Sequence, residues 1–241
     1  MCELCAIAGR PMARRNFLRF AGGAAGLALA PRAFAKETKT PPKPENVLSP
    51  DAALDRLMKG NARYVDGVSK RHDFKHEREP LSKGQNPYAA VLSCADSRIA
   101  PELCFDTARG DVFVCRVAGN FADEEIIASF EYAVHVLNTP LIVVLGHEAC
   151  GAVDATIKSI KDGTTLPGHL PALVHALTPA VEAAQKQPGD LLANAIRGNV
   201  AMTVDRLKTT APILKAAADD KKIRVVGGVY ALKTGRVELL S

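Results

Sequence analysis

Four short apolar runs, separated by stretches of helical periodicity, constrain the fold of this 241-residue chain most strongly. Strands that are apolar along their whole length are buried on both faces, as in parallel sheets covered by helices. The pattern therefore predicts an α/β fold with a mainly parallel central β-sheet covered by helices. The runs occupy residues 88–93, 112–117, 141–146 and 224–230, and a weaker fifth run at 236–240 follows the Thr234-Gly235 turn.

Three segments between and before these runs are expected to be helical. Residues 49–65 begin with Ser49-Pro50-Asp51, which combines a capping residue, a proline suited to the first turn and an acidic side chain. Residues 129–137 form the second segment, and residues 150–220 form a long third one that several glycines and prolines interrupt. Residues 66–87 are polar and show no clear element.

Residues 1–35 are predicted to be a twin-arginine signal peptide. Arg14-Arg15 precedes an apolar run at 20–30, and Ala33-x-Ala35 is a small-x-small cleavage site. The apolar run is too short to span a bilayer, so we expect cleavage, release into the periplasm and no stable membrane insertion. An uncleaved anchor or a chance match is the alternative.

The cysteines of Cys2-x-x-Cys5 lie upstream of the twin arginines. A redox role is possible for such a motif, but the pair would be discarded with the signal peptide. The mature chain would then begin at Lys36, and Met12 could be the true start.

The rest of the chain divides into a linker and one domain. Residues 36–48 are rich in proline and lysine and are interpreted as a solvated linker, and residues 49–241 as a single folded domain. Residues 1–35 hold five of the 31 basic residues and one of the 26 acidic residues, so the remainder is nearly neutral despite the overall charge of +5. The sequence therefore offers no electrostatic reason to expect nucleic-acid binding.

Residues able to bind a metal follow two of the predicted strands. Cys94-x-Asp96-x-Arg98 comes directly after the first run, and His147-x-x-Cys150 comes directly after the third. Because ligand sites of open α/β sheets lie beyond the carboxyl ends of the strands, we expect these residues to meet. Two thiolates and one imidazole form a ligand set for catalytic zinc, with a fourth position open to water or to Asp96.

The cysteines also allow other interpretations. Cys94 and Cys150 could form a disulfide in an oxidising compartment, which would make the chain a thiol-redox protein, or they could be inert core residues. Cys104 and Cys115 are expected to be small buried hydrophobic side chains.

The combination of motifs resembles the β-class carbonic anhydrases from about Ser49 to Leu240. The sequence departs from the family pattern at Val117, where an asparagine is common, and at Ala152, where a second glycine is usual. Besides the two cysteine motifs, the matching pieces are Gly60-Asn61-x-Arg63-Tyr64, Gly84-Gln85-x-Pro87, Ala118-Gly119-Asn120, Ser129-Phe130-Glu131-Tyr132-Ala133 and Gly228-Val229-Tyr230-x-x-x-Thr234-Gly235.

The resemblance implies that residues 49–241 are a catalytic domain that hydrates carbon dioxide reversibly to bicarbonate and a proton. Cys94, His147 and Cys150 would hold Zn²⁺, and zinc-bound hydroxide would attack the substrate. Asp96 would accept a hydrogen bond from that hydroxide while Arg98 holds it, or would itself ligate zinc in a closed, inactive state.

The resemblance also assigns the substrate pocket and the assembly. Gln85 would hydrogen-bond the substrate, and Phe113, Ala118 and Tyr132 would line an apolar pocket, some of them from a neighbouring subunit. A homodimer or larger homo-oligomer is therefore expected, with the helix at 49–65 wrapping onto the partner.

Two questions within the family stay open at the level of sequence. One branch is switched off by bicarbonate through a tryptophan three residues before the first cysteine; Val91 stands there and the chain has no tryptophan. We therefore expect the open branch. Related proteins hydrolyse carbonyl sulfide or carbon disulfide on the same scaffold, and a non-catalytic zinc-binding paralogue is a further alternative.

Overall fold

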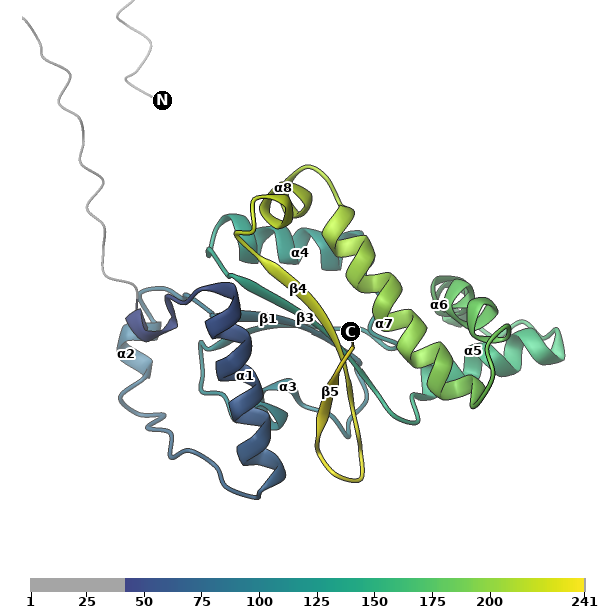
Figure 1. The fold of residues 1–241 in the computed structure, drawn as a ribbon, viewed down its shortest axis with the longest axis horizontal. Helices are drawn as coiled ribbons and strands as arrows, with labels where there is room; N and C mark the ends of the chain where they lie inside the picture. Colours follow the sequence, from purple (N-terminus) through teal and green to yellow (C-terminus); the bar gives the residue numbers. More distant parts are fainter. Residues whose placement is uncertain (1–41, 241) are drawn as a thin grey trace, which may run out of the picture. The chain divides into compact units, whose positions relative to one another are not determined.

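A five-stranded sheet in the order β2-β1-β3-β4-β5 forms the centre of the fold (Figure 1). The computed structural model describes residues 42–240, so the predicted signal peptide lies outside the described residues. The first four strands in this order are parallel, and β5 is antiparallel to β4. The predicted mainly parallel sheet is therefore confirmed. The strands are β1 (Ala89–Ser93), β2 (Val112–Arg116), β3 (Leu141–His147), β4 (Arg224–Tyr230) and β5 (Val237–Leu239).

The strand order places a topological switch point between β1 and β3. From β1 the chain moves outward to β2, and it then returns to the other side of β1 to form β3. The connection that leaves β1 toward β2 and the connection that leaves β3 toward β4 therefore run in opposite directions, which opens a crevice at the carboxyl ends of β1 and β3. Ser93 is paired with Leu145 in register, so the residues that follow these two strands emerge side by side.

Helices cover both faces of the sheet (Figure 1). The helices of one layer are α4 (Glu124–His135), α5 (Gly151–Asp162), α6 (Leu170–Ala184), α7 (Leu191–Thr209) and α8 (Ile213–Asp219). The opposite layer contains α1 (Pro50–Val65) and the short α3 (Pro101–Cys104), and α2 (Arg78–Leu81) is a single turn in the polar region between α1 and β1.

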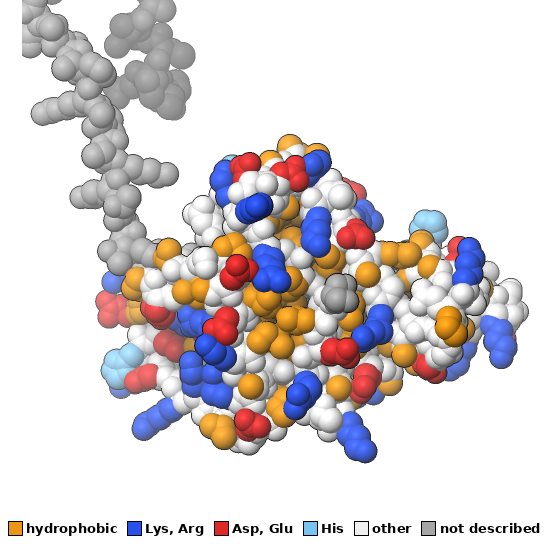
Figure 2. Space-filling view, in the orientation of Figure 1, with side chains coloured by type: hydrophobic (Ala, Val, Ile, Leu, Met, Phe, Trp, Pro, Cys, Tyr) orange, Lys and Arg blue, Asp and Glu red, His pale blue; other side chains and the backbone are white. Residues whose placement is uncertain are grey.

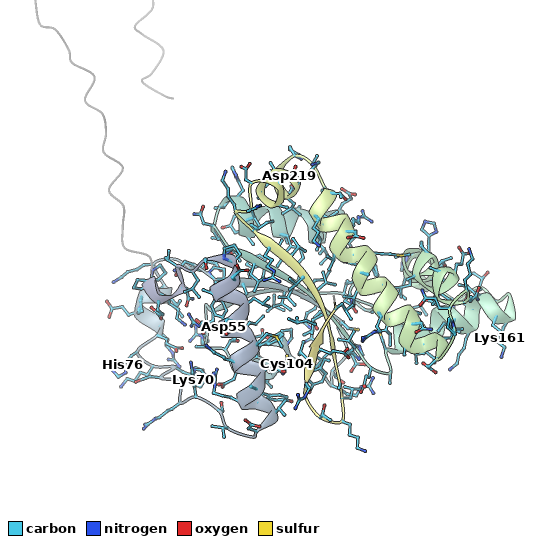
Figure 3. The ribbon with its side chains drawn as sticks, in the orientation of Figure 1. Asp55, Lys70, His76, Cys104, Lys161 and Asp219 are labelled. Carbon is cyan, nitrogen blue, oxygen red and sulfur yellow. The ribbon has the colours of Figure 1, made fainter. Side chains whose placement is uncertain are left out.

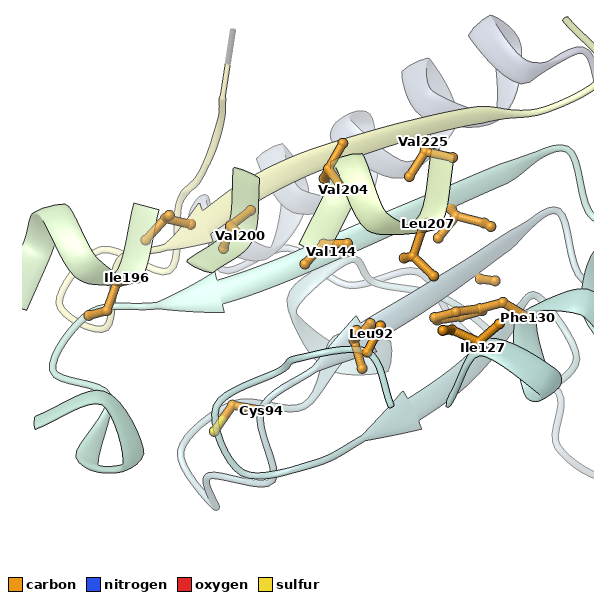
Figure 4. Close-up of a cluster of buried hydrophobic side chains, with 14 of the residues drawn as sticks. Leu92, Cys94, Ile127, Phe130, Val144, Ile196, Val200, Val204, Leu207 and Val225 are labelled. Atoms are coloured by element: carbon orange, nitrogen blue, oxygen red, sulfur yellow. The ribbon is translucent and has the colours of Figure 1, made fainter. Parts of the chain in front are cut away.

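Alternate residues of each strand face the two layers. Leu92, Val144 and Val225 point to the α4–α8 layer, where they pack with Val200 and Leu207 of α7 (Figure 4). The interleaved residues point to the other layer and pack with Ala53, Leu54 and Leu57 of α1; these are Ala89, Val91, Leu141, Val143 and Leu145. Both faces of β1 and β3 are buried, which explains the continuous apolar runs of these two strands.

Helix α1 begins as the sequence predicts. The Ser49 side chain accepts a hydrogen bond from the backbone N–H of Ala52, and Pro50 occupies the first turn. The helix buries its apolar stripe on the sheet of its own chain. Contact between its outer surface and a partner subunit stays a prediction.

Two helical predictions differ from the structure in their limits. Helix α4 begins at Glu124 rather than at 129, because Asp123 caps it by accepting a hydrogen bond from Ile126 N–H. The segment 150–220 contains four helices. Its first break lies at Gly163, a left-handed residue that ends α5, whereas Pro179 lies inside α6.

Within residues 42–48, the described part of the predicted linker, Pro44, Glu45 and Val47 are exposed but two polar residues are not. Lys43 and Asn46 are buried. The Lys43 ammonium pairs with the Asp111 carboxylate just before β2, and the Asn46 amide donates to the same carboxylate over 3.2 Å. The backbone of Lys43 also exchanges two hydrogen bonds with the Asn86 side chain. Charged side chains stay buried when they are paired in this way, and local composition does not reveal the partner.

The surface in Figure 2 shows basic and acidic side chains interspersed rather than gathered by sign, with hydrophobic side chains between α1 and α7. Within residues 42–240, none of the helices combines the length and the apolar character that a membrane span requires.

Candidate metal centre

Cys94 lies at the switch point, one residue beyond the end of β1 (Figure 4). The backbone around it stays paired with the loop after β2: Val117 N–H donates to the Ser93 carbonyl, and Ala95 N–H donates to the Val117 carbonyl. These bonds extend the β1–β2 pairing beyond the regular strands. They hold the Cys94 side chain in the crevice, where it is 3% exposed.

The second motif lies at the end of the adjacent strand. His147 is the last residue of β3, and Cys150 is the N-cap position of α5. The turn between them places Ala149 at φ +50°, a left-handed conformation that is uncommon for a residue with a side chain. This tight turn returns the chain so that both side chains face the same point.

The three predicted ligands meet in the structure. One ligand atom each from Cys94, His147 and Cys150 lies within 4.8 Å of the others, and the two sulfurs are 4.0 Å apart. An S–S bond is about 2.05 Å long, so the cysteines are free thiols here rather than the alternative disulfide. All three side chains are buried.

The imidazole of His147 is oriented for metal binding. Its Nδ1 lies 2.9 Å from the Glu148 carbonyl oxygen, which can only accept, so Nδ1 carries the proton. The other nitrogen, Nε2, is buried and has no hydrogen-bond partner among residues 42–240. A buried lone pair without a partner costs free energy, and a metal ion would satisfy it.

These atoms fit Zn²⁺. Zinc–sulfur bonds of about 2.3 Å in a tetrahedral site imply a sulfur–sulfur separation of roughly 3.8 Å, close to the observed value. The donor set of two thiolates and one imidazole matches catalytic zinc sites that leave one position open. The structure thus brings together the three ligands named from the sequence.

Asp96 points toward the same centre but is paired with Arg98. The guanidinium donates two parallel hydrogen bonds, from Nε to Oδ1 over 2.9 Å and from Nη2 to Oδ2 over 2.7 Å. These bonds hold the pKa of Asp96 well below its usual range. Arg98 Nη2 also donates to the Ala149 carbonyl over 3.1 Å, which ties the pair to the turn between the other ligands. Asp96 Oδ2 lies 3.9 Å from His147 Nε2.

Donors around Cys94 favour its thiolate. The Cys150 thiol makes the largest contribution to lowering the pKa of Cys94, and the Gly119 N–H adds to it. The Gly119 N–H donates to Cys94 Sγ over 3.3 Å. Thiolates rather than thiols bind metals, so these contacts prepare the sulfur for a cation.

Arg116, at the end of β2, is a residue whose role the sequence did not reveal. Its guanidinium donates to the carbonyl oxygens of Cys94, Asp96 and Ile99 over 3.0, 2.8 and 2.9 Å. It therefore holds the backbone of the loop that carries Cys94, Asp96 and Arg98. An arginine at a strand end is a weak signal, because its acceptors are backbone atoms that no sequence pattern marks.

The four predicted substrate-pocket residues lie in two different parts of the fold. Ala118 lies beside the metal ligands, since the next residue donates to Cys94. Gln85 is exposed and precedes β1, whereas Cys94 follows it. Five strand residues span roughly 16 Å, so Gln85 lies near the opposite edge of the sheet.

Phe113 and Tyr132 are also on that side. Phe113 pairs in register with Ala90 near the start of β1, and its ring centroid lies 6.4 Å from that of Tyr132 on α4. The Tyr132 side chain is exposed. Within one chain, these two residues and Gln85 are not brought to the three metal ligands.

The other two described cysteines lie apart from the cluster. Cys104 is buried on α3, beneath α1, where its carbonyl accepts a hydrogen bond from Asn61 (Figure 3). Cys115 lies on the edge strand β2 and is half-buried. Neither is among the three residues that can share a metal ion.

The fold and site define a class: a metal-binding α/β protein whose Cys-His-Cys ligands lie at the switch point of a mainly parallel sheet. A family model described as carbonic anhydrase matches residues 89–237. The chain is 38% identical over 192 residues to carbonic anhydrase 2 of Mycobacterium tuberculosis (strain CDC 1551 / Oshkosh), covering 79% of this chain and 93% of that protein. The chain therefore belongs to the carbonic anhydrase family, and the structures below place it in the β class.

Solved structures share the fold. The β-carbonic anhydrase CafA of Aspergillus fumigatus superposes with a TM-score of 0.60 at 25% identity, covering 79% of this chain and 90% of that one. A tetrameric β-carbonic anhydrase of Sordaria macrospora superposes with a TM-score of 0.61 at 22% identity, covering 79% and 98%, which shows the fold alone.

Proposed function

We propose that this protein is a zinc enzyme that interconverts carbon dioxide and bicarbonate. The observation that carries the proposal is the convergence of Cys94, His147 and Cys150 on one point, where the buried Nε2 of His147 has no hydrogen-bond partner within the described part of the chain. The named relatives are carbonic anhydrases, which favours carbon dioxide over carbonyl sulfide or carbon disulfide as substrate.

The protein's own side chains would bind the metal and orient the attacking group. Cys94, His147 and Cys150 would hold zinc, which lowers the pKa of a bound water so that hydroxide is available near neutral pH. Asp96, kept ionised by Arg98, would accept a hydrogen bond at Oδ2 and thereby orient the attacking group. Arg116 would keep this loop fixed through its three backbone contacts.

We further propose that the resting site is open. The two parallel hydrogen bonds from Arg98 occupy both carboxylate oxygens of Asp96, which opposes its rotation onto the metal. Val91 stands where the branch inhibited by bicarbonate carries tryptophan.

The active unit in this proposal is at least a homodimer. Gln85, Phe113 and Tyr132 lie away from the metal ligands of their own chain, so they would reach a substrate pocket only as part of another subunit. A partly exposed aromatic pair beside the edge strand β2 suits such an interface, because aromatic side chains contribute strongly to interface stability.

The test pairs zinc content with carbon dioxide hydration, and carbonyl sulfide hydrolysis serves as a parallel assay. Wild-type protein should contain one zinc per chain and hydrate carbon dioxide, whereas Cys150→Ser should lose both. Cys115→Ser is the matched control, because Cys115 is a free cysteine outside the ligand cluster. Full zinc content and full activity in Cys150→Ser would refute the proposal.

The N-terminal region would act before catalysis. Residues 1–35 would direct export of the folded protein by the twin-arginine pathway, and cleavage after Ala35 would release the enzyme into the periplasm. The N-terminal sequence of protein recovered from the periplasm should begin at Lys36. Recovery of uncleaved chain in the cytoplasm, with Arg14 and Arg15 intact, would contradict this.

A further inference from the structure

The loop after β2 donates a backbone hydrogen bond directly to a metal ligand. Gly119 N–H lies 3.3 Å from Cys94 Sγ, and both groups are buried. A hydrogen bond to a thiolate disperses its charge, and interactions that orient first ligands commonly set metal affinity. What holds this N–H in place therefore matters for the zinc site.

Gly119 is constrained on its other sides as well. Its φ is +85°, which favours glycine, and a Cβ at this position would lie 2.8 Å from Leu177 Cδ1 of α6. The neighbouring turn is closed by a hydrogen bond of 2.9 Å from Asn120 N–H to the Val117 carbonyl. The glycine is thus packed closely between the metal site and the helical layer.

Asn199 supplies the remaining contact from a distant part of the chain. Its side-chain Nδ2 donates to the Gly119 carbonyl over 2.7 Å, and the side chain is buried. Because a carbonyl only accepts, the group facing it must be the NH₂ of the amide. Asn199 lies on α7 next to Val200, on the face that packs against the sheet, where a polar side chain is costly unless it is bonded.

We propose that Asn199 is a positioning residue for the metal centre: by holding the Gly119 carbonyl, it aims the Gly119 N–H at the Cys94 sulfur. This inference rests on the proposed zinc site. It assigns a role to the Ala118-Gly119-Asn120 motif and links helix α7 to Cys94, the ligand that follows β1. The role is separate from that of Arg98, which acts on Asp96.

The first test compares Asn199→Leu with Thr203→Val. Leucine retains the volume but has no donor, whereas Thr203 is a buried polar residue one turn further along α7 with no contact to the ligands. Zinc affinity, measured by competition with a chromophoric chelator, should weaken about 10- to 100-fold in Asn199→Leu only. With cobalt in place of zinc, the thiolate-to-metal charge-transfer band should move to longer wavelength, because a thiolate that has lost its donor holds its electrons less tightly.

A second measurement needs no variant. In wild-type protein loaded with cadmium-113, the Gly119 amide proton should show scalar coupling to the metal through Cys94 Sγ. Absence of that coupling, or equal affinity and spectra in Asn199→Leu and Thr203→Val, would overturn the inference. Failure of the wild-type protein to bind zinc, cobalt or cadmium would instead refute the proposed zinc site.

Discussion

Individual side chains at this site are matched to one task each. His147 has one nitrogen bonded to a carbonyl and, among the residues described, no hydrogen bond at the other, whereas Asp96 has both oxygens bonded to Arg98. The first arrangement leaves His147 able to bind a metal, and the second keeps Asp96 from binding it. Asp96 lies close enough to the centre to act on a bound group, so its partner decides whether it orients that group or displaces it.

Replacement of Arg98 should therefore change the state of the site. In Arg98→Leu, Asp96 loses its two charged hydrogen bonds and becomes free to ligate zinc, so we expect hydration activity to fall about 10- to 100-fold while zinc is retained. Arg98→Lys should also be impaired, because an ammonium lacks the two-pronged geometry. Stopped-flow assay with metal analysis measures both quantities.

Arg224→Leu provides the control for removing an arginine. Arg224 pairs with Asp51 at the opposite end of β4 from the metal ligands, and both side chains are exposed. The Arg224→Leu variant should keep wild-type hydration activity. If Arg98→Leu were as active as Arg224→Leu, Asp96 would not need its partner.

At the scale of elements, the close approach of α7 to the sheet depends on two glycines. A Cβ on Gly146 of β3 would lie 2.6 Å from Val200 Cγ2, and a Cβ on Gly227 of β4 would lie 2.6 Å from Val200 Cγ1. Both glycines therefore leave space for one valine of the helix. The same helix carries Asn199, so this packing also sets the position of the Gly119 loop.

Gly227→Ala should lower the free energy of unfolding by about 1–3 kcal/mol, because the added methyl group overlaps Val200. Val200→Ala should relieve the overlap, so the double variant should be less destabilised than the sum of the single variants. Urea denaturation of the zinc-loaded protein measures these values. Gly198→Ala, in the same helix but without a close contact, should stabilise the protein by up to about 1 kcal/mol. If the effects of Gly227→Ala and Val200→Ala on the free energy of unfolding were additive, the added methyl group would not be in conflict with Val200.

At the scale of the whole molecule, three of the four predicted pocket residues lie near the edge of the sheet opposite the metal ligands; these are Gln85, Phe113 and Tyr132. In the proposed homodimer, a complete site would combine two chains in a symmetric assembly, each supplying what the other lacks. This arrangement would explain why an exposed Gln85 and an exposed Tyr132 carry family motifs.

Mixing two inactive variants tests this sharing. Gln85→Leu keeps its metal ligands, and Cys150→Ser keeps Gln85, so a mixed dimer would contain one intact site. Refolding the two together should restore up to about a quarter of wild-type activity. Each variant refolded alone is the control. If the mixture stays as inactive as its components, Gln85 acts on its own chain or has no role.

Much of the fold and the ligand triad was predictable from the sequence. Once Leu141–Leu145 and the other apolar runs are recognised as parallel strands, the residues directly after them are expected at the same edge of the sheet, where ligand sites of open α/β sheets lie. The start of α4 at Glu124 and the burial of Lys43 were not predictable in the same way. The first depends on a single capping side chain, and the second depends on a carboxylate nearly seventy residues away.

The sequence by itself determined which residues can bind the metal, because ligand chemistry belongs to side chains and their placement follows from local patterning. Only the tertiary structure decided how those ligands are held. Arg116 and Asn199 act through backbone carbonyls that any residue could supply, so no pattern marks them. Such contacts exist only after distant segments have packed, and for that reason the support of the site is a property of the folded molecule.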